Sequence, residues 1–521
     1  MTGSPAQIRF EMLAVAVFAA IGFACVMYST SRSIGLTPDS ASYIAAARNF
    51  VSGEGLTIFV DGQQVPLTHY PPLLPLLLAV PGAFGIDPMI GVRWLNALSF
   101  AGAIVFAGYF ARLLVPGSVL ANLFACCLIL TSITLHQIYA MAWSEPVFIL
   151  ITLAGLTTFA RYFEHRERSV LIVAAVFAGL ALLTRYLGIV LIFVCILTMI
   201  FSSRRALRDK MIEVVIFGVI SCGPLFLWLN RNLLQGDTLA NREIAVHLVT
   251  LEKLRHGLVA ISHWFIPGRF ASPEVGLLVL LSLFLLAYYM IVKYRNDFRH
   301  DNGTVLRMSS VALLSTVALY VVCYPTLVMI SISFFDIHTP LDDRILSPVY
   351  VLLMIFVAST TAYLMHHCRP KWLATSIAST VFAAMLGLHL ARTPAWIVSA
   401  SDSSLEYGST RWRQSPTIAF LEKLPADSVI YTNGPGVIYV RANRVVKRLP
   451  LSTDAATLQP NENYQEALMD MARSLRQNDG YLVYFHGIHP PFLPYLAEFW
   501  DKLPFDLVYE ADDGVVAKIR K

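Results

Sequence analysis

Long apolar runs decide what this chain can fold into. Eleven of them lie between residues 12 and 390, and most are as long as a helix that crosses a bilayer, which needs about 20 mostly apolar residues. They are too many to be buried in one water-soluble core. Charged residues make up 14% of the chain, whereas soluble domains carry roughly a quarter. The sequence therefore predicts a mainly α, polytopic transmembrane helix bundle.

The apolar runs give the boundaries of the expected spans. The first run follows Arg9, is long for the apolar part of a signal peptide and lacks a clear cleavage site, so we expect it to remain as a helix. The fifth and sixth runs are short and meet at Arg185. The eleven expected spans are Met12–Ser31, Met89–Leu114, Ser118–Leu135, Trp143–Phe163, Ser169–Leu183, Tyr186–Phe201, Met211–Leu229, Val275–Val292, Val305–Ile332, Ile345–Met365 and Trp372–Leu390.

Basic residues predict the orientation, because cytoplasmic loops of membrane proteins are rich in Lys and Arg. They gather in alternate connections, which also explains the net charge of +5 without a nucleic-acid partner. We therefore expect a cytoplasmic N-terminus in a bacterial inner membrane, and residues 32–88, 230–274 and 393–521 on the periplasmic side. The basic residues are Arg161, Arg166, Arg168, Arg204, Arg205, Arg208, Lys210, Lys293, Arg295, Arg299, Arg307, Arg369 and Lys371.

Two outer segments differ from the spans. Pro71–Phe84 is apolar but too short to cross, so it predicts an interfacial or re-entrant helix within the first outer loop, residues 32–88. After a transmembrane module at residues 1–392, residues 401–521 alternate helical and strand patterns and predict a small α/β domain. Its expected elements are a helix at 417–423, a strand at 428–432, a plain turn at 433–436, a strand at 444–449, a helix at 463–476, a strand at 481–485 and a strand pair at 507–519.

Two carboxylates on the outer side are candidate functional groups, because ionisable residues at membrane depth are costly. Asp39 follows the first span and can serve as a proton acceptor, or Asp39 or Ser40 can cap the next helix; the sequence leaves both open. Glu145 begins the fourth span, where it suits the positive end of the helix dipole. Trp143 beside it is suited to stacking on a sugar or headgroup, or to anchoring at the interface.

Basic residues on the same side are candidate phosphate ligands. Arg185 interrupts an apolar stretch and either reaches to headgroups or binds a phosphate between helices. Arg231 lies on the outer face against the positive-inside trend. Asp342 and Asp343 could hold a divalent cation, but the adjacent Arg344 favours a salt-bridged helix cap. No other cofactor is expected, and the seven cysteines have no metal or disulfide pattern and predict buried apolar positions.

Six motifs occur along the chain in an order that resembles the GT-C class of membrane glycosyltransferases, which contains protein O-mannosyltransferases and the lipid A aminoarabinose transferase. The resemblance covers about residues 10–390. The matching residues are Asp39 with Ser-Tyr43, Gly53-Glu-Gly55 and Tyr70-Pro-Pro-Leu-Leu-Pro75 of the first outer loop, Arg93-Trp-Leu-Asn96, Trp143–Pro146, Leu183–Gly188, Trp228–Gly236 and Asp342–Pro348.

This resemblance implies transfer of a sugar from a polyprenyl-phosphate carrier to a lipid, glycan or protein acceptor at the periplasmic face. The family's catalytic acid falls on Asp39 and its second acid on Glu145. Many relatives have two adjacent acids in the first loop, whereas this chain has Asp39-Ser40. The residues implied in substrate binding are Tyr43, His69, Tyr70, Arg93, Trp143, Arg185, Arg231, Asp343 and Arg344.

Two other classes of function compete with a transferase. A lipid or glycan transporter often shows internal repeats and charges at mid-depth. The sequence has no evident repeat, and its ionisable residues gather at one face. A non-catalytic scaffold would be favoured if Asp39, Glu145 and Arg185 lay far apart. The transferase hypothesis therefore predicts that these three side chains share one site.

Overall fold

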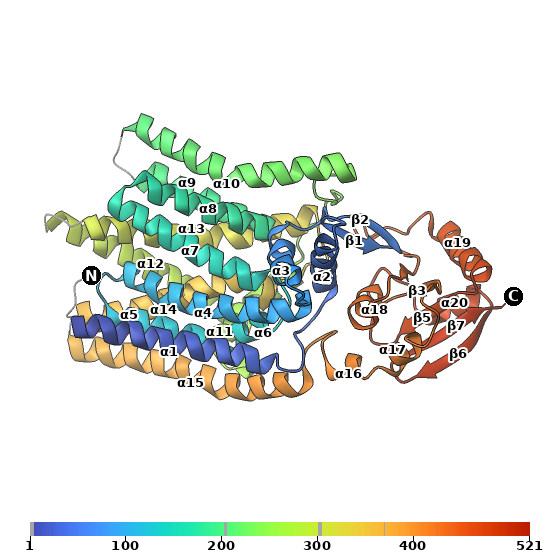
Figure 1. The fold of residues 1–521 in the computed structure, drawn as a ribbon. Helices are drawn as coiled ribbons and strands as arrows, with labels where there is room; N and C mark the ends of the chain where they lie inside the picture. Colours follow the sequence, from blue (N-terminus) through green and yellow to red (C-terminus); the bar gives the residue numbers. More distant parts are fainter. Residues whose placement is uncertain (1–4, 203–205, 301–304, 369, 521) are drawn as a thin grey trace.

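A long helix bundle and a small sheet domain lie at opposite ends of the protein (Figure 1). The computed structural model describes residues 5–202, 206–300, 305–368 and 370–520. The N-terminal end of the bundle lies far from the sheet domain, and the C-terminus lies in that domain. The bundle helices are α1 (Pro5–Ser29), α4 (Pro88–Leu114), α5 (Val119–Leu130), α6 (Ile133–Tyr139), α7 (Glu145–His165), α8 (Arg168–Thr184), α9 (Ile189–Ser202), α10 (Leu207–Gly236), α12 (Pro273–His300), α13 (Val305–Phe334), α14 (Asp343–His367) and α15 (Lys371–Ser403).

Eight of the described helices are long and apolar enough to span a membrane. The expected third span is broken, because α5 and α6 are bent by 59° relative to each other. The expected fifth and sixth spans form the shorter apolar helices Arg168–Thr184 and Tyr186–Phe201. The polytopic helix bundle is confirmed, and the count of eleven spans stays a prediction. Of the basic residues used for orientation, Arg204, Arg205 and Arg369 lie outside the described residues, as do the side chains of Arg295, Arg299 and Arg307.

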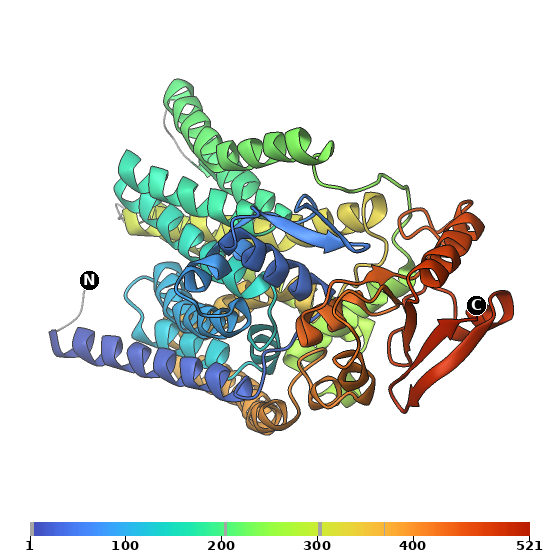
Figure 2. The ribbon, with the colours of Figure 1, turned by 45° about the vertical axis from the view of Figure 1, so that its right-hand side comes forward.

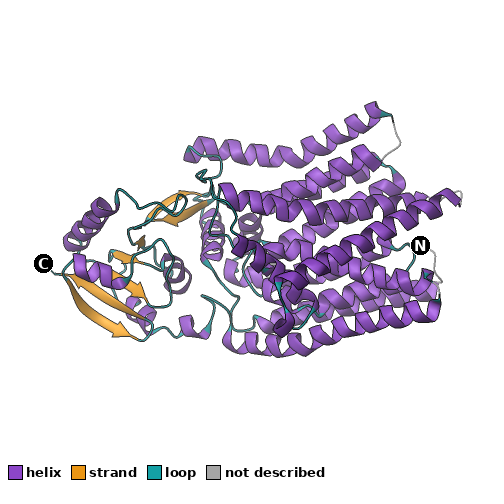
Figure 3. Cartoon of the chain, turned by 180° about the vertical axis from the view of Figure 1, so that it is seen from behind, coloured by secondary structure: helices purple, strands orange, loops and turns teal. Residues whose placement is uncertain are grey.

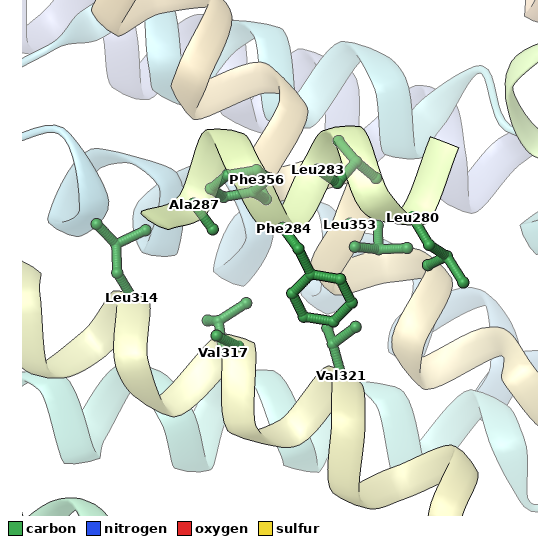
Figure 4. A pocket seen from close by; sticks show the side chains of 10 residues that line it. Leu280, Leu283, Phe284, Ala287, Leu314, Val317, Val321, Leu353 and Phe356 are labelled. Atoms are coloured by element: carbon green, nitrogen blue, oxygen red, sulfur yellow. The ribbon is translucent and has the colours of Figure 1, made fainter. Parts of the chain in front are cut away.

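Helix α14 forms the centre of the bundle. Its apolar stretch is entirely buried, whereas α1 lies at the periphery and exposes Phe10, Met12 and Leu13 by 62–66%. A helix that is apolar all round is stable only in such a core or against lipid. Side chains of α12, α13 and α14, among them Phe284 and Phe356, meet around an apolar gap of only about 30 Å³ (Figure 4). The gap lies near the surface of the bundle, because Phe284 is 37% exposed.

The loop after α1, residues 32–88, folds between the bundle and the sheet domain. It contains α2 (Pro38–Val51), the hairpin of β1 (Thr57–Val60) and β2 (Gln63–Pro66), and α3 (Leu73–Ala83). Figure 2 shows the hairpin beside α2. The predicted short apolar helix at 71–84 is confirmed by α3. The segment between α10 and α12 contains α11 (Leu251–Phe265), which packs on α12 and α14 and was not predicted.

The C-terminal domain contains a five-stranded mixed sheet. Its strand order is β4-β3-β5-β7-β6; β3 is parallel to β4 and β5, and β7 is antiparallel to β5 and β6. Figure 3 shows that the described strands all lie at this end of the molecule. The elements are α16 (Thr410–Arg413), α17 (Pro416–Leu421), β3 (Ile430–Thr432), α18 (Pro435–Ala442), β4 (Lys447–Arg448), α19 (Tyr464–Gln477), β5 (Tyr481–Phe485), α20 (Leu496–Lys502), β6 (Phe505–Ala511) and β7 (Gly514–Ile519).

The predicted strands and the predicted helix at 463–476 are present, but the plain turn at 433–436 is wrong. Pro435 is the first residue of α18, where its fixed φ and missing N–H suit a helix start. Helix α18 packs on α2, and Gly436 lies against Ala41. The backbone N–H of Tyr407 also donates to Leu36 O at 2.9 Å. The domain is thus held directly against the loop that carries Asp39.

Candidate active site

Asp39 lies in the first turn of α2 but does not cap it. The cap is Thr37, whose backbone N–H donates to Ser40 Oγ at 3.1 Å, so the alternative in which Asp39 or Ser40 is the cap residue is wrong. Pro38 occupies the first helical position, as proline often does. The Asp39 carboxylate is therefore left for other partners. Tyr70 O–H donates to its Oδ1 at 2.8 Å, and Arg344 Nη2 donates to its Oδ2 at 2.6 Å.

Arg344 joins the two predicted carboxylates. While its Nη2 binds Asp39, its Nε donates to Glu145 Oε1 at 2.8 Å. Glu145 also forms an ion pair with Arg185, whose Nη1 donates to Ser144 Oγ at 3.0 Å. The structure therefore brings Asp39, Glu145 and Arg185 into one cluster. The scaffold alternative required these three residues to lie far apart, and they do not.

Burial differs along this cluster. The side chain of Glu145 is 1% exposed and that of Arg185 is 14% exposed, whereas Asp39 is 28% exposed. The alternative in which Arg185 reaches to headgroups is wrong, because its guanidinium is buried against Glu145. Two carboxylates and two guanidiniums give the cluster no net charge, as a buried ion cluster requires. Arg185 Nε is buried and has no hydrogen-bond partner among the described residues.

Trp143 packs against the Arg344 side of the cluster. The guanidinium carbon of Arg344 lies 4.2 Å from the centre of the Trp143 ring, which is a cation–π contact. Trp143 Nε1 donates to Thr37 Oγ1 at 3.0 Å, so the tryptophan joins α2 to α14. Arg344 covers one face of this ring.

Asn96 on α4 holds the chain before Trp143 in place. Its Nδ2 donates to Tyr139 O at 2.9 Å and to Met141 O at 2.7 Å. Gly35 pairs with the same segment through Ala140 O and the Ala142 N–H. Asn96 was not predicted as a site residue, although the Arg-x-x-Asn motif contains it.

Aromatic side chains from the first loop line the Asp39 side of the cluster. The ring of Tyr70 lies edge-on to Tyr43 at 4.9 Å and to His69 at 4.7 Å. Burial and the negative charge of Asp39 raise the pKa of both tyrosines, so both stay protonated at neutral pH. Burial and the positive charge of Arg242 lower the pKa of His69, which is therefore neutral at pH 7. This wall supplies hydroxyl groups rather than charges.

Asp39 itself is held as a carboxylate. Burial alone would raise its pKa, but the charge of Arg344 and the hydrogen bonds from Arg344 and Tyr70 outweigh burial and leave the pKa lowered. A carboxylate offers about four lone-pair sites. The two bonds above leave sites on both oxygens for an incoming hydroxyl group.

Three other predicted residues contact groups outside this cluster. Arg231 donates to Leu67 O at 2.8 Å and Leu56 O at 2.9 Å, and so fastens the first loop to α10. Arg93 donates to Thr30 Oγ1 at 3.3 Å near the end of α1. Asp343 accepts a hydrogen bond from Trp264 Nε1 at 2.7 Å. Their part in substrate binding stays a prediction.

The Asp342–Arg344 segment is a helix cap, as expected, but not a salt-bridged one. Asp342 Oδ1 accepts a hydrogen bond from the Ile345 N–H at 3.0 Å, whereas Arg344 turns to Asp39 and Glu145. In the described part of the chain, no group of three or more His, Cys, Asp or Glu side chains is placed to hold a metal ion.

Comparison with known proteins places this site in context. Residues 40–231 match the family described as dolichyl-phosphate-mannose-protein mannosyltransferase. No curated protein matches the chain by sequence.

Several solved structures resemble the chain over most of its length, and two of them serve as examples. One is ArnT from Cupriavidus metallidurans bound to undecaprenyl phosphate, with 14% identity, a TM-score of 0.57 and coverage of 96% of this chain and 97% of that chain. Another is the oligosaccharyltransferase AglB from Archaeoglobus fulgidus in complex with an inhibitory peptide and a dolichol-phosphate, with 11% identity, a TM-score of 0.56 and coverage of 99% and 75%. With its apolar helices and this likeness, the chain is a multi-pass membrane protein with the GT-C fold.

Proposed function

We propose that the chain is a glycosyltransferase that moves a sugar from a polyprenyl-phosphate donor to an acceptor hydroxyl at the periplasmic face of a bacterial inner membrane. The observation that carries this proposal is the partly exposed Asp39 carboxylate, joined through Arg344 to the buried Glu145. The match to mannosyltransferases and the polyprenyl phosphates in the ArnT and AglB complexes support the choice of donor.

Asp39 acts as the general base in this proposal. Its carboxylate takes the proton of the acceptor hydroxyl while the acceptor oxygen forms a bond to the anomeric carbon of the sugar. The bond between that carbon and the phosphate oxygen breaks, and the carrier phosphate leaves with the electron pair. Attack from the side opposite the phosphate inverts the anomeric configuration.

The guanidiniums of Arg344 and Arg185 stabilise the leaving phosphate. Arginine offers a planar set of donors that matches phosphate oxygens, and Arg185 Nε is free of protein partners among the described residues. The developing charge would lie in a partly buried site, where such donors act more strongly than in water.

Glu145 has a positioning role in this mechanism rather than a direct one. Its side chain is 1% exposed and its oxygens already accept from Arg344, Arg185 and Ser144. An acceptor hydroxyl therefore has far better access to Asp39. We propose that Glu145 keeps both arginines charged and oriented.

The test compares two carboxylates on the same side of the membrane. In a strain that lacks the gene, mass spectrometry of envelope lipids and glycans identifies the sugar that is missing. The wild-type chain and the Asp87→Asn control should restore it, because Asp87 only caps α4 and pairs with Arg48, and asparagine is also a good cap. Asp39→Asn should insert normally and not restore it.

Restoration by Asp39→Asn would reject the proposed base. A lipid or glycan transporter, the competing hypothesis, predicts a different result. Loss of a transporter would leave the lipid-linked sugar on the wrong side of the membrane, whereas loss of a transferase would leave it unused on the same side as the acceptor. Linkage analysis and a membrane-impermeant label for the lipid-linked sugar distinguish the two outcomes.

A further inference from the structure

A second polar site lies at the end of the bundle far from Asp39. A cavity of about 600 Å³ is bounded by the first half of α1, the last turns of α4 and α7, and the start of α5. That volume is within the usual range of ligand pockets, about 300–1,000 Å³. Glu11 on its wall lies 29 − 11 = 18 residues before Ser29 along α1, or roughly 27 Å at 1.5 Å per residue. The cavity and Asp39 are therefore separated by about the thickness of a bilayer core.

One wall of this cavity contains a buried ion pair. Glu11 is 3% exposed, forms an ion pair with Arg112 and accepts a hydrogen bond from Asn122 Nδ2 at 2.6 Å. Gly108 allows the close approach of α5, because a Cβ there would collide with Asn122. A carboxylate inside a spanning helix is costly and by default marks a functional position. The proposed mechanism at Asp39 does not use it.

A second ion pair lies closer to the opening. Arg161 Nη1 lies 3.6 Å from Glu164 Oε2, which is too long for a hydrogen bond, and the guanidinium carbon lies 5.1 Å from the centre of the Tyr109 ring. The Arg161 side chain is 38% exposed and that of Glu164 is 11% exposed. Arg161 Nη1 also lies 3.3 Å from His165 Nε2, and Glu164 Oε2 lies 3.8 Å from the same nitrogen. A guanidinium has five N–H donors, so these contacts leave donors of Arg161 for a ligand.

The remaining wall is apolar and opens toward the lipid-facing surface. It is formed by Ile8, Met12, Val15 and Ala16 of α1 and by Val105 of α4. Met12 is 66% exposed and Val105 is 40% exposed. A ligand of this cavity must therefore present both charge and hydrocarbon.

We propose that the cavity binds a zwitterionic phospholipid of the leaflet opposite the Asp39 site. The lipid phosphate pairs with Arg161, its ammonium group pairs with Glu164, and its acyl chains lie along Met12 and Val105. Two acids and two arginines line the cavity, so its net charge is zero and complements a headgroup of zero net charge better than an anionic one. The buried pair of Glu11 and Arg112 forms the polar floor under that headgroup.

Native mass spectrometry of the full-length protein in detergent tests the proposal. The probes are phosphatidylethanolamine, phosphatidylglycerol and the chain-free headgroup glycerophosphoethanolamine. Phosphatidylethanolamine should be retained best. Val105→Trp fills the cavity and should lower its retention about tenfold or more, which corresponds to about 1.4 kcal/mol. Leu98→Trp is the matched control on the same helix, because Leu98 is 60% exposed and does not line the cavity.

A second variant tests the proposal even if Val105→Trp fails to fold. Arg161→Gln removes the positive charge without filling the cavity and should also lower phosphatidylethanolamine retention, with an unfolding temperature close to that of the wild type. Equal or stronger retention of phosphatidylglycerol would overturn the zwitterionic assignment. Binding of the chain-free headgroup as tightly as the lipid, or unchanged retention in both cavity variants, would overturn the lipid site.

Discussion

Arg344 on α14 donates a hydrogen bond of 2.6 Å to Asp39 on α2, although 305 residues separate them in the sequence. The bond joins the centre of the bundle to the loop after α1. Because α14 is buried along its whole apolar stretch, Arg344 holds the Asp39 carboxylate against the core of the bundle.

Replacing Arg344 by lysine should abolish most activity, although the charge is kept. Nε and Nη2 of one planar group reach two different carboxylates, whereas a lysine ammonium is a compact charge that cannot copy this fork. We expect at least a hundredfold loss in sugar transfer by the purified enzyme, or about 2.7 kcal/mol in the barrier. Lys371→Arg, at the other end of the bundle from Arg344, is the control, and activity of Arg344→Lys near the wild-type level would contradict the prediction.

Replacing Glu145 by glutamine should destabilise the protein and should change substrate access to Asp39 little. The change leaves Arg185 and Arg344 without their shared buried carboxylate, and removing one partner of a buried pair costs about 3–5 kcal/mol. Thermal unfolding in detergent measures this loss. Glu145→Asp retains the charge and should lose less stability; an unchanged unfolding temperature in Glu145→Gln would show that the cluster does not depend on this carboxylate.

The sequence predicts the helices of the bundle well and the ion cluster only in part. Apolar runs and strand patterns reflect local chemistry, so the spans, α3 and the strands of the sheet domain could be read from short windows. Helix α18 was missed because Gly434 and Pro435 resemble a turn, yet proline also favours the first position of a helix. The capping role of Thr37 was missed in the same way, since Pro38 marks Thr37 as the residue before the helix.

The pairing of Arg185 with Glu145 could not be read from the sequence. The residues lie 40 positions apart and meet only because α7 packs against α8 and places Arg185, at the end of α8, beside the start of α7. Helix packing of this kind depends on the shapes of whole surfaces rather than on local patterns. The motif that contains Asn96 could be recognised in the sequence. Its hydrogen-bond partners, two backbone carbonyls near Trp143, could not.

Two substitutions of Trp143 should separate the effect of its stacking contact with Arg344 from the effect of its hydrogen bond to Thr37. Trp143→Phe keeps an aromatic face under Arg344 but loses the bond to Thr37 Oγ1, whereas Trp143→Ala loses both. A partly desolvated cation–π contact contributes about 1–2 kcal/mol. We expect sugar transfer to fall in the order wild type, Trp143→Phe, Trp143→Ala. Equal rates in the two variants would show that the ring face has no role in holding Arg344.

Tyr70→Phe should shift the acid limb of the pH–rate profile upward. The pKa of Asp39 is lowered in the folded protein, so the ionised base is present above that pKa and lost as pH falls through it, below the usual value of about 3.9 for aspartate. The Tyr70 hydroxyl helps to lower this pKa, and its removal moves the loss of activity to higher pH. The same sign applies to stability: the contribution of Asp39 is fully present above its unfolded pKa and disappears on acidification.

Rates of sugar transfer from acidic to neutral pH, measured for the wild type and Tyr70→Phe, check the shift. Tyr28→Phe, at an exposed tyrosine on α1, is the control. A downward or absent shift would show that Tyr70 does not stabilise the Asp39 carboxylate during turnover.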